Sequence, residues 1–425
     1  MNFTLRAILV GFVGGCLAGP LAADDLVISG ARVFTATGPV AREGLNVVIR
    51  DDRIAAVSTD VEPPEDAVVI DGRGYTVLPG LIDPHVHLFF DLTGDGPAFP
   101  TSDADAEAFL MREMPADLED YLDHGFTTLL AAIDFWPHIL KVRARLESGE
   151  LRGPRLLAAG GVLMAPGWHY ICGRLKGEPK QWCNDHVAVQ IDSPSSAVAA
   201  VQRYAASGVD AIVYDSMTNA SGVDPAVVTA VVDTARASGL PVLVHNSDTA
   251  GYAALMDAGV DGFLHPPAGT LDTTTGEWRV ISGAVPEGLV LGITIGETEE
   301  AIRNGQRSPE QQAAFSWTRK NVQYLLANGA LPVYASDIPG AAPDYTMPIV
   351  IRSLTDLGLT PAEVLQAATI HAAAALGQAD EIGSLEAGKR ADVLVVRGDP
   401  TRDPAALGEV VLVIQNGEIV VDNRP

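Results

Sequence analysis

The chain has 425 residues, of which 47% are hydrophobic and 19% are charged. This composition is typical of a globular protein and excludes wholesale disorder. The formal net charge is -26, and because so acidic a surface repels polyanions, we expect no nucleic-acid partner.

The first two dozen residues have the layout of a secretory signal peptide. Arg6 is followed by an apolar run at 7–17 and by the small residues of 21–23, which offer a cleavage site. The run is too short to span a bilayer, and no later apolar run reaches the necessary length of about 18 residues. We therefore expect 1–23 to be removed and the mature protein to be periplasmic or secreted. The alternative is a lipid anchor at Cys16, which ends a Val-Gly-Gly-Cys run.

Short strands of alternating pattern occur at both ends of the chain. They lie at 26–29, 32–34, 45–49, 53–57 and 68–70, and again at 391–396, 410–415 and 418–421. Neither set is large enough to bury a core alone. We therefore predict that residues 24–77 and 381–425 pair into one small β-sandwich domain.

Between these ends, residues 78–380 alternate between short apolar runs and amphipathic stretches. Eight strands are expected, at 78–88, 127–133, 155–159, 211–214, 241–244, 262–264, 289–295 and 331–335. Helices are expected after most of them, at 106–123, 139–148, 195–207, 225–238, 250–258, 309–327 and 361–376. Apolar strands joined by helices indicate a parallel sheet covered on both faces. Eight such units predict a (β/α)8 TIM barrel, an α/β fold whose active site lies at the C-terminal ends of its strands.

Two cysteines, Cys172 and Cys183, remain once the expected signal peptide has been removed. They flank a polar, loop-like stretch beyond the third expected strand. A disulfide persists in an oxidising compartment, so a bridge is favoured over two buried thiols. Zinc binding by this pair alone is not expected, because the chain has no second pair of cysteines.

Several strand ends carry side chains that can bind metals. His85 and His87 end the first expected strand, where residues two apart share a face and can bind one ion. His245, His265 and Asp337 end the fifth, sixth and eighth strands. In a barrel these ends meet on one face, so the five side chains are expected to lie together.

Two runs resemble motifs of the amidohydrolase superfamily. The run Leu-Pro-Gly-Leu-Ile-Asp-Pro-His-Val-His at 78–87 resembles the opening motif of this superfamily. The run Gly-Ser-Leu-Glu-Ala-Gly-Lys-Arg-Ala-Asp at 383–392 is similar to the family's return into the sandwich. With the later histidines and the aspartate in order, the resemblance covers nearly the whole mature chain and is closest to the imidazolonepropionase-like and prolidase-like branch.

The resemblance implies a role for each polar residue at the strand ends. It implies that His85, His87 and His245 are metal ligands and that Asp337 is both a ligand and the proton shuttle. It implies that His265 is either a ligand of a second metal or a hydrogen-bonding partner of the substrate.

One position departs from the pattern of binuclear members, which carry a carboxylated lysine on the fourth strand to bridge two metals. Val213 occupies the aligned position and has no ligand atom, which favours one ion per chain. Asp215 shares the inward face of Val213 and is the expected substitute if a second ion binds, whereas Tyr214 would require a slip of one residue. Asp215, Tyr214 and His169, which follows the third strand, are candidates for contact with the substrate.

The ligand set suits Zn²⁺ or a similar divalent ion, because it combines imidazoles with a carboxylate and contains no thiolate. Such an ion lowers the pKa of bound water toward about 7. Asp337 would transfer the proton to the leaving group, and His265 would stabilise the oxyanion. We therefore expect hydrolysis of a C–N bond in a small amide, peptide or cyclic amide.

Two other functions are compatible with this fold. A deaminase uses the same activated water, but relatives of that kind often carry a glutamate near the fifth-strand histidine, where Asn246 and Ser247 follow His245 here. A catalytically silent binding protein is supported by Val213 alone. The segments at 94–105 and 167–185 are expected to shape the pocket, and their composition favours a neutral or mildly anionic, partly apolar substrate. The oligomeric state is not indicated.

Overall fold

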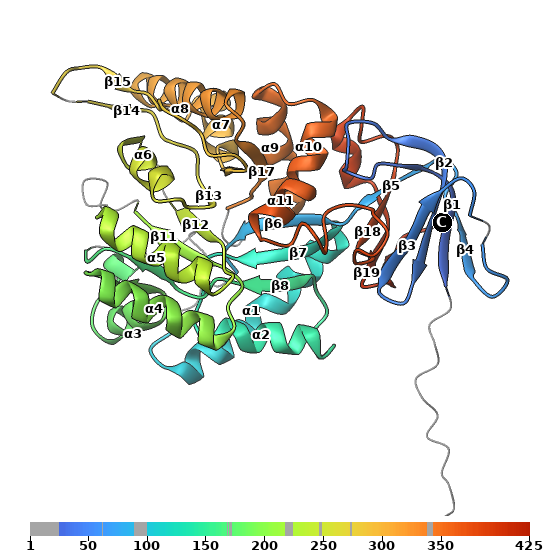
Figure 1. Cartoon of the computed structure of the whole chain (residues 1–425), viewed down its shortest axis with the longest axis horizontal. Coiled ribbons are helices and arrows are strands. Elements are labelled where there is room, and N and C mark those ends of the chain that lie inside the picture. Colours follow the sequence, from blue (N-terminus) through green and yellow to red (C-terminus); the bar gives the residue numbers. More distant parts are fainter. Residues whose placement is uncertain are drawn as a thin grey trace, which may run out of the picture.

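The computed structural model describes residues 25–425, except 62, 89–99, 168, 170–171, 217–223, 246–248, 273 and 338–342. The expected signal peptide, including Cys16, therefore lies outside the described residues. Figure 1 shows a barrel beside a smaller β-domain, to which both the blue N-terminal and the red C-terminal parts of the chain contribute strands. Among the described helices, none combines the length and the apolar character that a bilayer span requires.

The barrel strands follow one another in chain order and run parallel. They are β6 (Leu81–Val86), β7 (Phe126–Ala131), β8 (Arg155–Ala158), β9 (Val162–Met164), β11 (Ile212–Asp215), β12 (Val242–His245), β13 (Gly262–Phe263), β16 (Val290–Ile293) and β17 (Leu331–Tyr334). Strands β8 and β9 share the third position, since β8 pairs with β7 and β9 pairs with β11. Strand β10 (Ala188–Gln190) extends the sheet beside β9. After β17, the backbone N–H of Asp337 donates to the carbonyl of His85 at 3.0 Å, which joins the last position to the first.

Helices cover the outside of the barrel (Figure 1). They are α1 (Asp103–Asp123), α2 (His138–Glu147), η1 (Cys172–Arg174), α3 (Glu178–His186), α4 (Pro194–Ser207), α5 (Pro225–Ala237), α6 (Thr249–Asp257), α7 (Gly296–Arg303), α8 (Pro309–Ala327), α9 (Pro343–Asp356), α10 (Pro361–Ala367) and α11 (Ile370–Ala375). Ser193, Ser308 and Thr360 cap α4, α8 and α10 through capping boxes followed by proline. These side chains satisfy the first backbone N–H groups, and for this reason the helices begin there.

Two expected elements are divided in the structure. The expected strand at 78–88 is split at Gly80. A Cβ atom at this position would overlap the side chain of Thr127, so glycine is required there. The expected helix at 361–376 is split into α10 and α11. The hydroxyl of Thr369 donates to the carbonyl of Leu365 at 2.6 Å at the break, and the backbone of Thr369 is not helical. The prediction of one continuous helix was therefore wrong.

The β-domain combines strands from both ends of the chain. These are β1 (Leu26–Val33), β2 (Arg42–Arg50), β3 (Arg53–Ser58), β4 (Val68–Asp71), β5 (Tyr75–Pro79), β18 (Val393–Arg397), β19 (Val410–Gln415) and β20 (Glu418–Asp422). Their order is β20-β19-β18-β5-β1-β2-β3, with β4 also paired to β1. Antiparallel pairing of β18 with β5 joins the two ends, and the sheet encloses an apolar core of its own. The remaining short elements are the hairpin of β14 (Thr270–Leu271) and β15 (Trp278–Arg279), which lies between β13 and β16, and the turn η2 (Pro404–Gly408), which lies between β18 and β19.

An ion pair between Arg155 and Asp392 attaches the β-domain to the barrel. Arg155 begins β8, and its Nη1 lies 2.6 Å from Oδ2 of Asp392, whose side chain is 4% exposed. The backbone N–H of Asn416 also donates to Asp392, and Gln415 donates to the carbonyl of Thr127 near the start of β7. The β-domain therefore contacts the N-terminal ends of these strands and leaves the C-terminal ends available for a site.

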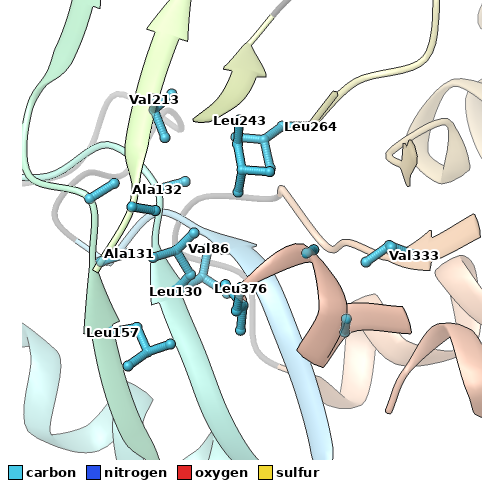
Figure 2. Close-up of a cluster of buried hydrophobic side chains, with 14 of the residues drawn as sticks. Val86, Leu130, Ala131, Ala132, Leu157, Val213, Leu243, Leu264, Val333 and Leu376 are labelled. Carbon is cyan, nitrogen blue, oxygen red and sulfur yellow. The ribbon is translucent and has the colours of Figure 1, made fainter. Parts of the chain in front are cut away.

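The strands are apolar where they cross the barrel and polar where they end. Figure 2 shows Val213 with Leu243 and Leu264 in a cluster of buried hydrophobic side chains. Val213 pairs with Leu243, and Asp215 pairs with His245 two residues further along the same two strands. Because residues two apart share a face, Asp215 and His245 follow directly above the apolar layer, on the side of the C-terminal ends.

Candidate metal centre

The carboxylate of Asp337, which follows the last barrel strand, lies among histidines from other barrel strands. Its Oδ1 is 3.1 Å from Nε2 of His85 and 3.0 Å from Nε2 of His87, the two histidines that follow one another on and after β6. Its Oδ2 is 3.5 Å from Nδ1 of His265, which follows β13. One carboxylate therefore contacts three imidazoles.

His245, at the end of β12, completes the group. Its Nε2 is 2.6 Å from Nε2 of His265. Two imidazole nitrogens this close share a proton, so one ring donates and the other accepts. Ligand atoms of His85, His245, His265 and Asp337 all lie within 4.8 Å of one another, so the structure brings these four together and keeps His87 in contact through Asp337.

The orientation of the imidazoles fits a metal ion. Nδ1 of His85 donates to the carbonyl of Leu264 at 3.2 Å, which directs the lone pair of Nε2 into the cluster. This Nε2 is buried and has no hydrogen-bond partner among the described residues. Nδ1 of His265 lies 3.0 Å from the hydroxyl of Thr294, and this contact restrains the orientation of a second imidazole. Imidazole nitrogens and a carboxylate are ligands for a divalent transition metal.

The surroundings of the cluster shift the pKa values of His85, His265 and Asp337. Burial is the largest influence on His265 and lowers its pKa to about 3, and it lowers the pKa of His85 well below the usual value. Burial alone would raise the pKa of Asp337, but His85, His265 and His87 together outweigh it and hold that pKa below its usual range. Neutral imidazoles beside an ionised carboxylate are in the form that binds metal.

Two features of the backbone hold the carboxylate in place. Asp337 has a φ of 50°, in the left-handed region that aspartate tolerates better than most residues. Oδ1 of Asp83 accepts from the backbone N–H groups of His85 at 3.0 Å and Ser336 at 3.4 Å. Burial raises the pKa of Asp83 to about 7. Asp83 and Thr294 were not assigned a role from the sequence, although Asp83 lies within the opening motif.

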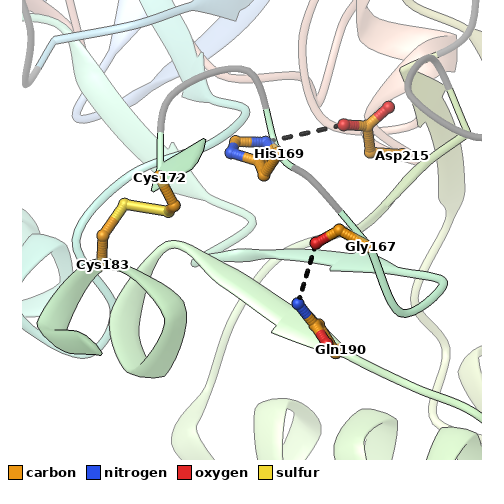
Figure 3. Close-up of a disulfide and its surroundings, with 6 residues drawn as sticks. All are labelled: Gly167, His169, Cys172, Cys183, Gln190 and Asp215. Carbon is orange, nitrogen blue, oxygen red and sulfur yellow. Dashed lines mark hydrogen bonds and ion pairs between the residues drawn. A yellow bond between two sulfur atoms is a disulfide. The ribbon is translucent and has the colours of Figure 1, made fainter. Parts of the chain in front are cut away.

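The other predicted site residues differ in their positions. Asp215 is buried, with Oδ1 3.8 Å from Nδ1 of His245 and Oδ2 3.5 Å from Nε2 of His169 (Figure 3). It therefore lies behind His245, and no described ligand group within 4.8 Å includes it. Tyr214 lies between Val213 and Asp215 on β11, and alternation directs its side chain to the opposite face. Asn246 and Ser247 lie outside the described residues.

A disulfide supports the segment that carries His169. Cys172 and Cys183 are bonded and join η1 to α3, as Figure 3 shows beside His169. The backbone N–H of Gly173 donates to the carbonyl of His169 at 2.7 Å. The disulfide therefore restrains the chain close to the contact between His169 and Asp215.

A cavity of about 420 Å³ opens beside His265 and is lined also by Thr294, Arg307 and Phe315. Arg307 is partly buried, and its Nε has no hydrogen-bond partner among the described residues. A larger cavity of about 510 Å³ lies between α9 and η2, and its lining contains none of the predicted site residues. The cavity beside His265 adjoins the candidate centre. Arg307 was not assigned a role from the sequence.

Residues 76–420 match the model of the amidohydrolase family. The chain belongs to the amidohydrolase family. It is 27% identical to imidazolonepropionase from Symbiobacterium thermophilum, over 97% of this chain and 95% of that protein. It is 29% identical to imidazolonepropionase from Solibacter usitatus, over 87% of this chain and 89% of that protein. The predicted family is thereby confirmed. The chain is a metal-dependent hydrolase that acts on carbon–nitrogen bonds and uses a divalent ion, as predicted.

Solved structures support the fold. Ochratoxinase from A. niger has a TM-score of 0.76 at 18% identity, covering 94% of this chain and 96% of that one. A Xaa-Pro dipeptidase with bound methionine has a TM-score of 0.73 at 22% identity, covering 93% of this chain and 99% of that one. The prediction of a TIM barrel with a small β-domain from both chain ends is confirmed.

Removal of the disulfide is expected to weaken the fold. The bridge closes a sequence separation of 11 residues, and a loop of this size stabilises a protein by about 3 kcal/mol through restriction of the unfolded chain. The double variant Cys172→Ser, Cys183→Ser should lose about that free energy of unfolding, measured by denaturant titration. Reduction of the wild-type protein should cause the same loss, and a double variant as stable as the oxidised wild type would contradict the prediction.

Proposed function

We propose that this amidohydrolase is an exported enzyme that uses one zinc ion per chain to hydrolyse an amide bond in a small, anionic substrate. The substrate class comprises N-acyl amino acids, dipeptides and cyclic amides that carry a carboxylate. The observation that carries the proposal is the contact of the Asp337 carboxylate with His85, His87 and His265, beside His245. The relatives named imidazolonepropionase and the Xaa-Pro dipeptidase support a substrate derived from amino acids.

We assign the metal ligands as His85, His87, His245 and Asp337. The bound ion would supply a Lewis acid that polarises the scissile carbonyl and makes water more acidic. His265 lies beside both His245 and Asp337, and in this proposal it stabilises the negative charge that develops on the substrate oxygen. His169 and Asp215 would hold His245 from behind and border the substrate.

Asp337 would move the proton during hydrolysis. The neighbouring histidines keep its pKa below the usual range, so the carboxylate is ionised at neutral pH and can accept a proton from the attacking water. It would then return that proton to the leaving nitrogen.

Arg307 would bind the carboxylate of the substrate. It lines the cavity that also contains His265 and Thr294, and its guanidinium group can form two parallel hydrogen bonds to a carboxylate. A substrate held in this way would extend from Arg307 to the cluster. This arrangement explains how a protein with a net charge of -26 can retain an anionic substrate.

The proposal of export is supported by the layout of residues 1–23 and by the disulfide, a bond typical of oxidising compartments. N-terminal sequencing of protein recovered from the periplasm or medium should give a mature chain that begins near Asp24. A mature chain that begins at a lipidated Cys16, or intact protein retained in the cytoplasm, would contradict it.

Replacement of the proposed proton carrier should separate turnover from substrate binding. Asp337→Asn should lower kcat by about 100- to 10,000-fold, because proton transfer contributes on this scale, while KM changes far less. Steady-state kinetics on zinc-loaded protein is the measurement, with Asp380→Asn, an exposed carboxylate, as the matched control. Near-normal turnover in Asp337→Asn would remove it from the mechanism.

The proposed single ion can be counted. Val213 provides no bridging group, and two divalent ions a few ångströms apart would repel strongly without one. After dialysis against metal-free buffer, about one zinc per chain should remain, unchanged in Asp215→Ala and lost in His245→Ala. Two retained ions that fall to one in Asp215→Ala would instead make Asp215 the bridging ligand.

The proposed role of Arg307 predicts a dependence on substrate charge. A charge-assisted hydrogen bond contributes about 1.5–3 kcal/mol, so Arg307→Gln should raise KM by about 10- to 100-fold for an N-acyl amino acid. The same variant should act on the carboxamide analogue with a KM close to that of the wild type. Arg402→Gln, at a strongly exposed arginine, is the control, and an equal effect on both substrates would refute the assignment.

A further inference from the structure

A second group of metal-ligating side chains lies outside the candidate centre, where three helices meet. Asp103 is the first residue of α1, His138 is the first residue of α2, and His186 is the last residue of α3. One ligand atom from each lies within 4.8 Å of the other two. The sequence pattern did not single out these residues, because they are far apart along the chain and none ends a strand.

The two distances from Asp103 match those between ligands of a small tetrahedral ion. Oδ1 of Asp103 is 3.3 Å from Nε2 of His138 and 3.5 Å from Nε2 of His186. Zinc–ligand bonds of about 2.0–2.1 Å at tetrahedral angles place neighbouring ligand atoms about 3.3–3.4 Å apart. An ion can therefore be bound between these atoms with little movement of the side chains.

Both imidazoles are aimed at this point. Nδ1 of His186 donates to the carbonyl of Trp136 at 2.8 Å, which leaves the lone pair of Nε2 facing Asp103. The side chain of His138 is only 3% exposed. Neither of its ring nitrogens makes a hydrogen bond of good geometry within the part of the chain that the structure describes. A buried imidazole in this state is costly unless it has a ligand.

Trp182 contacts all three residues of the group. Its ring stacks on His186 with centroids 4.3 Å apart and lies at 28° to His138 at 6.2 Å. Its Nε1 donates to Oδ1 of Asp103 at 3.3 Å, and the next residue, Cys183, is fixed by the disulfide. The side chain of Asp103 is 72% exposed, so an ion can enter from solvent and water can complete its coordination.

We propose that Asp103, His138 and His186 form an auxiliary site for a divalent transition metal, with zinc as the favoured ion. Two imidazoles and one carboxylate suit zinc, whereas magnesium and calcium prefer oxygen ligands throughout. The ion crosslinks the start of α1 and of α2 to the end of α3. Because the site is open to solvent and has three protein ligands, it exchanges zinc more readily than the barrel centre does.

Titration calorimetry with Zn²⁺ tests this site separately from the catalytic one. Dialysed protein that retains its barrel ion should bind one further zinc per chain, and its Tm should rise when zinc is added. Both effects should be lost in Asp103→Asn, which preserves the shape of the side chain. They should also be lost in His186→Asn, which keeps a donor for the carbonyl of Trp136 but removes the Nε2 ligand.

The matched control is His124→Asn, because His124 also lies beside a carboxylate, Asp120 at 3.3 Å, but belongs to no three-ligand group among the described residues. This control should bind the additional zinc as the wild type does, and so should His245→Ala, whose defect lies in the barrel centre. Equal uptake of the additional zinc by wild type, Asp103→Asn and His186→Asn would overturn the proposal, as would the absence of uptake in folded wild-type protein.

Discussion

The contact between the Asp337 carboxylate and the imidazoles of His85, His87 and His265 is the interaction on which the functional end of this barrel depends. It joins the last strand position to the first, where the backbone of Asp337 also donates to His85. An ionised carboxylate in a buried position is stable only when it is paired. Burial lowers the pKa values of two of its neighbours, His85 and His265. A divalent cation held by His85, His87, His245 and Asp337 would offset the negative charge of this carboxylate.

The remaining architecture keeps the two ends of the barrel distinct. At the N-terminal ends of the strands, Arg155 and Asp392 attach the β-domain through a largely buried ion pair. At the C-terminal ends, polar side chains emerge above an apolar layer that includes Val213 and Leu243 (Figure 2). The contacts that stabilise the fold and the polar side chains of the candidate site therefore lie at opposite ends of the barrel, as is usual for this fold. The disulfide and the three-helix group around Trp182 restrain the segments beside the chemical end.

Local pattern was enough to predict the barrel, because each strand is a short apolar run followed by a helix, and a histidine or an aspartate at the end of such a run must reach the same face. It predicted that Val213 and Asp215 share a face, and β11 pairs with β12 in the register that this requires. It could not predict the break at Thr369, where a hydroxyl replaces a helical contact. Nor could it find Arg307 or the pairing of Asp103 with His138 and His186, since these depend on tertiary approach between distant segments. The roles of the individual site residues remain predictions.

The most direct test of the central claim is anomalous X-ray diffraction at the zinc edge from crystals of dialysed protein. The account predicts one strong anomalous peak in the barrel, about 2.0–2.2 Å from the Asp337 carboxylate and the neighbouring imidazole nitrogens. Two strong peaks about 3.5–4 Å apart within that cluster would show a binuclear centre. A barrel with no peak there, in protein that still hydrolyses its substrate, would contradict the account altogether.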